Sequence, residues 1–253
     1  MGAPHGHLLH YHGHSVVHRT PAHLKIAALL AFVVVVVATP GTEFWAFGAY
    51  LALLLGVVAL SRVPPAYILP RMVVEVPFLV FALLLPFIAT GERVDVGPFS
   101  LSEPGLLAAW TLVAKGTLGV LAALVLATTT EGRDLVAGLQ RLRMPALMVQ
   151  ILSFMLRYLE VVGAEMRRMR IARESRGFHG RGLRAWPVLA SSAGALFIRS
   201  YERGERVHLA MLSRGYAGRL PLTQSEPADA SQLARAAALP GAALLVLLRA
   251  YVW

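Results

Sequence analysis

The sequence predicts an all-α, polytopic membrane protein with about five transmembrane helices and a cytoplasmic domain of two or three amphipathic helices. Of the 253 residues, 57% are hydrophobic and 15% are charged, whereas soluble domains have about 25% charged residues. The apolar residues form separate runs near the length of membrane spans, and most arginines lie in one later segment. Cysteine is missing from the sequence, which excludes disulfides, thiolate metal sites and thiol nucleophiles.

Residues 1–23 form a polar, histidine-rich N-terminal tail, expected on the cytoplasmic side. Closely spaced imidazoles can bind nickel, cobalt, copper or zinc ions. The tail has no acidic residue to complete such a site, so the alternative is a solvated segment without a specific ligand. We expect no firm metal site here, and the weak candidates are His5, His7, His10, His12 and His14.

Four apolar runs follow within residues 24–130, and each is predicted to be a transmembrane helix. A helix needs roughly 20 residues to span the ~30 Å hydrocarbon core. The first run is therefore short, and its β-branched residues end at Pro40. A fifth run follows a polar linker at 220–235. The five predicted spans are residues 24–39, 43–60, 72–90, 105–128 and 236–253.

The charges of the loops predict the orientation of these spans. Arginine and lysine are enriched in cytoplasmic loops. The N-terminal segment has Arg19 and Lys25, and the loop after the second run has Arg62 and Arg71. The loop after the first run has neither residue type, and the loop after the third has only Arg93, with three acids nearby. We therefore expect a multi-pass protein of the cytoplasmic (inner) membrane with its N-terminus in the cytoplasm.

Two ionisable residues, Glu75 and Lys115, are candidate intramembrane polar groups. A charge at the bilayer centre costs about 2.5–3.5 kcal/mol on insertion scales, so Lys115 should face protein or a polar cavity. One interpretation is a substrate or coupling residue. The alternative is a structural ion pair or a side chain that extends to the interface.

Residues 131–219 contain 16 of the 24 Lys and Arg residues and 7 of the 14 acids. Apolar residues at helical spacing persist among these charges, which predicts helices from Ala146 to about Ser175 and from about Trp186 to Gly215. Hydropathy alone would allow a span at 144–162. Such a span would place MRRMRIARESRG outside, against the positive-inside bias. We therefore interpret both helices as cytoplasmic or interfacial.

A ten-residue pattern occurs twice in this basic segment. Residues 172–181 read ARESRGFHGR and residues 210–219 read AMLSRGYAGR, with six of ten positions identical. Each glycine is expected to end a helix in a left-handed conformation, which places an arginine on the last turn of each helix. The candidate site residues are those of the two Ser-Arg-Gly-aromatic segments: Ser175, Arg176, Gly177, Phe178, Ser213, Arg214, Gly215 and Tyr216.

Several kinds of chemistry are excluded or disfavoured. Neither lysine follows a glycine, so the chain has no standard nucleotide-binding P-loop. A membrane enzyme that uses Lys115, Glu75 and histidines stays an alternative, although these residues form no recognisable catalytic pattern. A membrane-anchored basic protein that binds nucleic acid is another. Acidic residues interleaved with the arginines disfavour a phosphate-tracking surface, so we expect no nucleic-acid partner.

The repeat and its surroundings resemble the T component of energy-coupling factor (ECF) transporters, and in particular the cobalt/nickel type, the CbiQ family. The resemblance covers about residues 15–220. It is most specific in LATTTEGRDLVAGLQRLRMP, in MLRYLEVVGAEMRRMRIARESRG and in RSYERGERVHLAMLSRGY. Both copies have Ser where the motif that names the family has Ala, a substitution of one small residue for another.

The resemblance implies a non-catalytic coupling subunit of an ATP-driven importer for cobalt or nickel ions. Its implied partners are two CbiO-like ATPase subunits, a CbiM-like membrane subunit that binds the substrate, an accessory small membrane protein and membrane lipid. The chain itself would bind no cofactor, because ATP and Mg belong to the ATPases. Each arginine-tipped helix end would dock on one ATPase, and residues 131–219 would form the coupling domain. A T subunit of a vitamin importer is the alternative within this resemblance.

Overall fold

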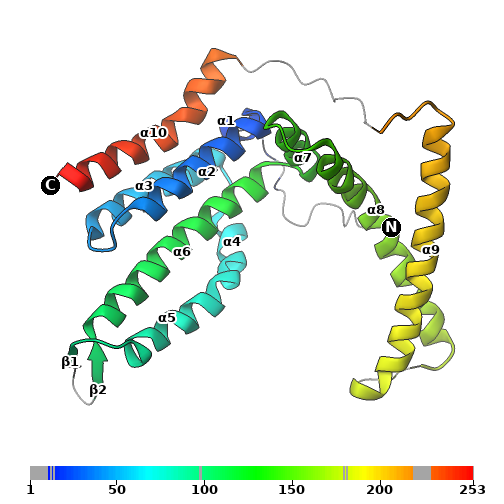
Figure 1. The fold of residues 1–253 in the computed structure, drawn as a ribbon, viewed down its shortest axis with the longest axis horizontal. Helices are drawn as coiled ribbons and strands as arrows, with labels where there is room; N and C mark the ends of the chain where they lie inside the picture. The colour runs from blue at the N-terminus through cyan, green and yellow to red at the C-terminus, as the bar shows by residue number, and fades with distance from the viewer. Residues whose placement is uncertain are drawn as a thin grey trace. The chain divides into compact units, whose positions relative to one another are not determined.

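A computed structural model describes residues 11, 13, 15–96, 99–178, 180, 182–218 and 229–252. The described chain is almost entirely helical and divides into two compact units (Figure 1). Of the described residues, those between 11 and 141 and those of 229–252 form one unit, and those between 142 and 218 form the other. The all-α, polytopic fold class predicted from the sequence is confirmed.

The larger unit contains the apolar helices. Its elements are α1 (Val16–Arg19), α2 (Ala22–Ala38), α3 (Phe44–Ser61), α4 (Pro65–Ile68), the 3₁₀ helix η2 (Leu69–Glu75), α5 (Val76–Ile88), β1 (Arg93–Val96), β2 (Phe99–Ser102), α6 (Glu103–Thr129), α7 (Gly132–Arg141) and α10 (Ala230–Val252). The two strands, which the sequence analysis did not predict, pair antiparallel and form the turn between α5 and α6.

The core of the larger unit lies among α2, α3, α6 and α10, which run side by side in Figure 1. Tyr50 of α3 is fully buried at its centre. Its hydroxyl lies 2.9 Å from the hydroxyl of Thr39, and its ring meets the ring of Phe32 edge-on. The buried hydroxyl is thus satisfied by a partner at the C-terminal end of α2.

The final helix begins earlier than its apolar run. α10 starts at Ala230, inside the stretch expected to be a linker. The backbone N–H of Asp229 donates to the Gln232 side chain at 3.3 Å, and the Asp229 carbonyl accepts the first helical hydrogen bonds. The bond from the N-cap backbone N–H to the side chain three residues later is one of the two bonds of a capping box. This signal precedes the apolar run, so the helix begins before it.

The smaller unit consists of α8 (Ala146–Ser175), η3 (Gly182–Ala185) and α9 (Trp186–Leu212). These bounds confirm the two long amphipathic helices predicted from the sequence. Among the described residues of α8 and α9, only Val149 and Leu196 are buried. Apolar side chains such as Ile151, Leu159 and Phe197 are therefore exposed in the isolated chain, so this unit needs a membrane surface or a partner protein to cover them.

Within the described residues, length and apolar composition select a set of five spans that differs slightly from the predicted one. The runs that qualify are α3, the continuous helical stretch Pro65–Ile88, α6, α8 and α10. α2 has 17 residues and falls short of the threshold. The first half of α8 is apolar enough to qualify, so its cytoplasmic placement rests on the charge argument alone and stays a prediction.

Candidate functional site

The first Ser-Arg-Gly segment ends α8 with a hydrogen-bonded glycine cap. Gly177 has φ of +77°, the left-handed conformation that residues with a β-carbon resist. Its N–H donates to the carbonyl oxygen of Glu174 at 3.0 Å, and the N–H of Phe178 donates to that of Arg173 at 3.1 Å. These two bonds form a Schellman motif, which satisfies carbonyls that the helix end leaves free.

The second segment repeats this geometry at the end of α9. Gly215 has φ of +82°. Its N–H donates to the carbonyl oxygen of Leu212 at 3.0 Å, and the N–H of Tyr216 donates to that of Met211 at 3.0 Å. The repeated sequence is therefore a repeated local structure, and we call residues 175–178 and 213–216 the first and second tips.

The two tips have the same pattern of exposed and half-buried side chains. Arg176 and Arg214 are exposed, whereas Phe178 and Tyr216 are half-buried. In the part of the chain that the structure describes, neither arginine has an ion pair or a side-chain hydrogen bond. The Ser175 and Ser213 hydroxyls donate to carbonyl oxygens of their own helices, both at 3.0 Å. The guanidinium groups are thus the polar groups that each tip offers to a partner.

The second tip is anchored in a way that the first is not. The Tyr216 hydroxyl donates to the amide oxygen of Gln150 at 2.6 Å, and its ring meets that of His208 edge-on. Phe178 at the equivalent position has no hydroxyl for such a bond. Gln150 lies near the start of α8, and Ser175 ends it. At 1.5 Å per residue, the two tips lie at opposite ends of this helix, roughly 40 Å apart.

An ion-pair cluster joins the second half of α8 to the middle of α9, where the two ribbons cross in Figure 1. The Glu165 carboxylate accepts from Arg199 of α9 at 2.6 Å and from Arg168 of its own helix at 2.5 Å. The Glu165 side chain is 17% exposed, whereas both arginines are well exposed. The cluster thus links two long helices whose far ends are the two tips.

The two intramembrane candidates are separate from each other. Glu75 is buried, and its carboxylate accepts a hydrogen bond from the Thr117 hydroxyl. The Lys115 ammonium donates to the carbonyl oxygen of Val37 at 2.7 Å, in the last turn of α2. Both residues contact neighbouring helices of the larger unit, an arrangement that favours the structural interpretation of these charges.

The weak metal candidates of the tail, from His5 to His14, lie outside the described residues. Where the structure describes the chain, it contains no group of three or more His, Cys, Asp or Glu residues that could hold a metal ion. His18 lies 2.7 Å from the Ser15 hydroxyl and 3.0 Å from the Tyr11 carbonyl oxygen. These neighbours are local structural partners.

Sequence reasoning missed three residues of this unit, namely Gln150, Glu165 and Arg199. The i,i+3 spacing of Glu165 and Arg168 was a usable signal for a pair on one helix. Gln150 and Tyr216 are 66 residues apart, and Glu165 and Arg199 are 34 apart. Their spacing in the sequence carries no signal of contact, because both pairs depend on how α9 returns along α8.

Comparison with known proteins gives consistent matches. A family model described as CbiQ, cobalt transport protein, matches residues 13–225. The chain is 30% identical over 154 residues to the cobalt transport protein CbiQ of Rhodobacter capsulatus, which covers 59% of this chain and 63% of that protein. It is 28% identical over 220 residues to the energy-coupling factor transporter transmembrane protein EcfT of Bacillus selenitireducens, which covers 81% of each.

A third relative, from Methanocorpusculum labreanum, is named as a fused cobalt transport protein, CbiMQ. It is 28% identical over 134 residues, which is 53% of this chain and 22% of that protein. The chain spans only 40 to 63% of the length of three relatives, among them the Rhodobacter protein.

Proposed function

The chain belongs to the CbiQ family of cobalt transport proteins, and we propose that it is the transmembrane coupling (T) subunit of an ECF-type, ATP-driven importer for cobalt or nickel ions. The observation that carries this proposal is the pair of tips, two helix ends with the same Schellman cap and an exposed arginine each. Two equivalent elements on one chain suit a partner that is present in two copies.

We assign each tip to one of two CbiO-like ATPase subunits. A guanidinium group presents donors in a rigid, planar fork that suits bidentate pairing with carboxylates. Arg176 and Arg214 have no partner among the described residues, so they can enter such pairs without breaking an existing one. Phe178 and Tyr216 add the half-buried aromatic surface that is common at the centre of interfaces.

Movement would pass from the ATPases through the two long helices. Closure of the ATPase pair on ATP would displace the tips relative to each other, and α8 and α9 would transmit this displacement because helices are stiff elements. The cluster at Glu165 and Arg199 would act as the joint between them. The chain itself is assigned no catalytic role, since ATP and Mg would bind to the ATPases.

The remaining assignments follow from charge and from the relatives. The positive-inside bias supports a cytoplasmic N-terminus, and it supports α8 on the cytoplasmic face of the inner membrane, together with both tips. The fused relative named CbiMQ supports a CbiM-like substrate-binding membrane subunit as the second partner. An accessory small membrane protein would complete the assembly. The metal ion would be bound by these partners, so the N-terminal histidines are assigned no essential role.

Charge reversal at the tips tests the proposal. Arg176→Glu and Arg214→Glu should each weaken co-purification of the ATPase subunits, and the double variant should abolish both co-purification and metal uptake. The matched control is Arg167→Glu with Arg203→Glu, two exposed arginines on the same helices away from the tips. Full co-purification and uptake in the double tip variant, or equal loss in the control, would overturn the docking assignment.

A further inference from the structure

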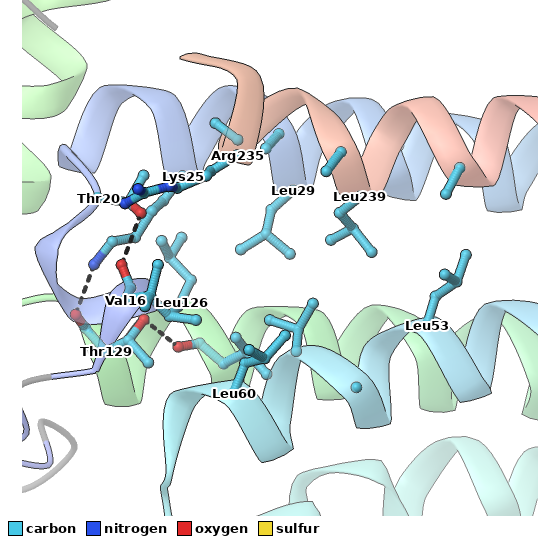
Figure 2. Close-up of a pocket in the computed structure, with 18 of the residues that line it drawn as sticks. Val16, Thr20, Lys25, Leu29, Leu53, Leu60, Leu126, Thr129, Arg235 and Leu239 are labelled. Atoms are coloured by element: carbon cyan, nitrogen blue, oxygen red, sulfur yellow. Dashed lines mark hydrogen bonds between the residues drawn. The ribbon is translucent and has the colours of Figure 1, made fainter. Parts of the chain in front are cut away.

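The larger unit contains a cavity of about 960 Å³ that the proposed coupling role does not use (Figure 2). Its walls come from α2, α3, α6 and α10, and Val16 and Val17 of α1 line one end. Most of the lining residues, 17 of 21, are Leu, Val, Ala or Gly. A cavity of this size accepts a molecule at least as large as a drug-like ligand, and walls of this kind favour an apolar one.

The polar groups of the cavity gather at one end. Figure 2 shows Lys25, Arg235, Thr20 and Thr129 together there, whereas Leu53 lies toward the other end. No aspartate or glutamate is among the lining residues. This end therefore combines two cations with no acidic side chain of its own.

Lys25 is held in place by neutral acceptors. Its ammonium donates to the carbonyl oxygen of Thr129 at 2.8 Å, to the hydroxyl of Thr130 at 3.1 Å and to the carbonyl oxygen of His18 at 3.4 Å. The residue is 8% exposed, and it forms no ion pair with any described residue. A positive charge is thus fixed at the cavity end.

Arg235 supplies the accessible donors. It lies near the start of α10, it is exposed, and its side chain has no hydrogen bond or ion pair to a described residue. Its planar fork matches the geometry of a phosphate oxygen pair. The structure therefore places a free, phosphate-matching group at the mouth of an apolar cavity.

The depth of the cavity matches one leaflet of a membrane. The lining residues of α10 run from Arg235 to Val246. These 11 helical steps correspond to about 16 Å, roughly half of the ~30 Å hydrocarbon core. A lipid whose headgroup lies at Arg235 would place its acyl chain along the cavity and end near the middle of the bilayer.

We propose that this cavity is a binding site for one anionic phospholipid of the leaflet on the N-terminal side, with its phosphate at Arg235 beside the fixed charge of Lys25. Basic pockets between transmembrane helices are a known mode of headgroup recognition. In the orientation proposed above, this leaflet is the cytoplasmic one. Lipid binding is measured on this chain without partner subunits, so its outcome is independent of the docking assignment.

Native mass spectrometry of the full-length chain tests the headgroup contact. The chain is released from vesicles of equal phosphatidylglycerol and phosphatidylcholine content, and the bound lipids are counted. Phosphatidylglycerol should be retained in excess, and Arg235→Gln should lower its occupancy by about tenfold, the effect of losing one charged hydrogen-bonded contact. Arg249→Gln makes the same charge change on the same helix, over Trp45 and away from the cavity, and should have no effect. Equal retention of both lipids, or equal effects of the two variants, would overturn the proposal.

A glycine pair tests the position of the acyl chain. Gly56 and Gly48 both lie in α3, and an added β-carbon meets nothing within 4 Å at either. Only Gly56 lines the cavity. Gly56→Leu should displace the bound phosphatidylglycerol, whereas Gly48→Leu should retain it. Full retention in Gly56→Leu would show that the lipid lies elsewhere and would also overturn the proposal.

Discussion

The Tyr216 hydroxyl and the Gln150 side chain are joined by a 2.6 Å hydrogen bond across 66 residues of sequence. The bond fixes the second tip to the beginning of α8, the helix that ends in the first tip. The first tip therefore ends α8, and the second tip lies beside the start of the same helix. Relative displacement of the two tips, which the proposed coupling requires, would therefore act on this bond as well as on the cluster at Glu165.

Removing this bond should loosen the second tip alone. Tyr216→Phe keeps the ring and reproduces the residue of the first tip, but it loses a half-buried hydrogen bond that contributes about 1 kcal/mol. We expect the amides of Gly215 and Tyr216 to exchange with deuterium about fivefold faster. The amides of Gly177 and Phe178 serve as the internal control. Unchanged exchange at both tips would show that the bond does not hold the second one.

The two cap glycines should resist substitution. Gly177→Ala or Gly215→Ala forces a β-carbon into the left-handed conformation, which costs about 1–2 kcal/mol. The matched controls are Gly163→Ala in α8 and Gly204→Ala in α9, interior helical positions where alanine is expected to stabilise by about 0.5–1 kcal/mol.

Thermal unfolding and ATPase co-purification measure this prediction. Both cap variants should lower the unfolding temperature of the chain and weaken co-purification, whereas both controls should leave co-purification intact. Cap and control variants with the same unfolding temperature would contradict the structural role of the glycines.

The ion-pair cluster should set the distance between the tips. The sequence contains no cysteine, so Ser175→Cys and Ser213→Cys introduce two unique sites for spin labels. We expect a narrow distance distribution centred at roughly 40 Å, from the length of α8 between Gln150 and Ser175. Glu165→Gln removes the charge between Arg168 and Arg199 and should broaden it.

Glu160→Gln is the control for this measurement, because Glu160 is exposed on the same helix. Similar broadening in both variants would mean that the cluster at Glu165 is not the joint. A centre far below the expected distance would contradict the placement of the tips at opposite ends of α8.

Local structure was largely predictable from the sequence, and contact between distant segments was not. The glycine after each arginine predicted both caps, because left-handed backbone geometry has a residue preference that can be read directly. Apolar periodicity predicted α8 and α9 to within a residue or two. The predicted start of α10 was too late because the polar residues before Ala236 indicated a linker, whereas the capping bond between Asp229 and Gln232 starts the helix earlier. The contact of Tyr216 with Gln150 has no signal in the sequence of either segment.

Neither apolar periodicity nor helix length decides which helices cross the bilayer. α2 is shorter than a usual span, and the first half of α8 is apolar enough to be one. What separates them is charge, because the second half of α8 is dense in arginine. The same reasoning left the role of Lys115 open, since its cost in the membrane fits either a functional group or a structural one.

The bond from Lys115 to Val37 makes this choice testable. The ammonium lies at the C-terminal end of α2, where the helix dipole and the free carbonyls favour a cation. In the structural interpretation, Lys115→Met loses this bond and destabilises the chain by about 1 kcal/mol. Metal uptake by the assembled transporter should then stay close to the wild-type level when corrected for the amount of protein in the membrane.

A coupling or substrate role gives the opposite result. Lys115→Met would then abolish uptake and leave the unfolding temperature unchanged. Lys115→Arg would retain uptake only if the role required a positive charge and not the exact shape of the lysine side chain. Thr111→Val is the control on the same face of α6. Among the described residues, the Thr111 hydroxyl bonds only to Leu107 of its own helix, so this variant should affect neither measurement. We expect Lys115→Met to lower stability and retain uptake, because the Lys115 ammonium already donates a hydrogen bond to a carbonyl oxygen at the end of α2.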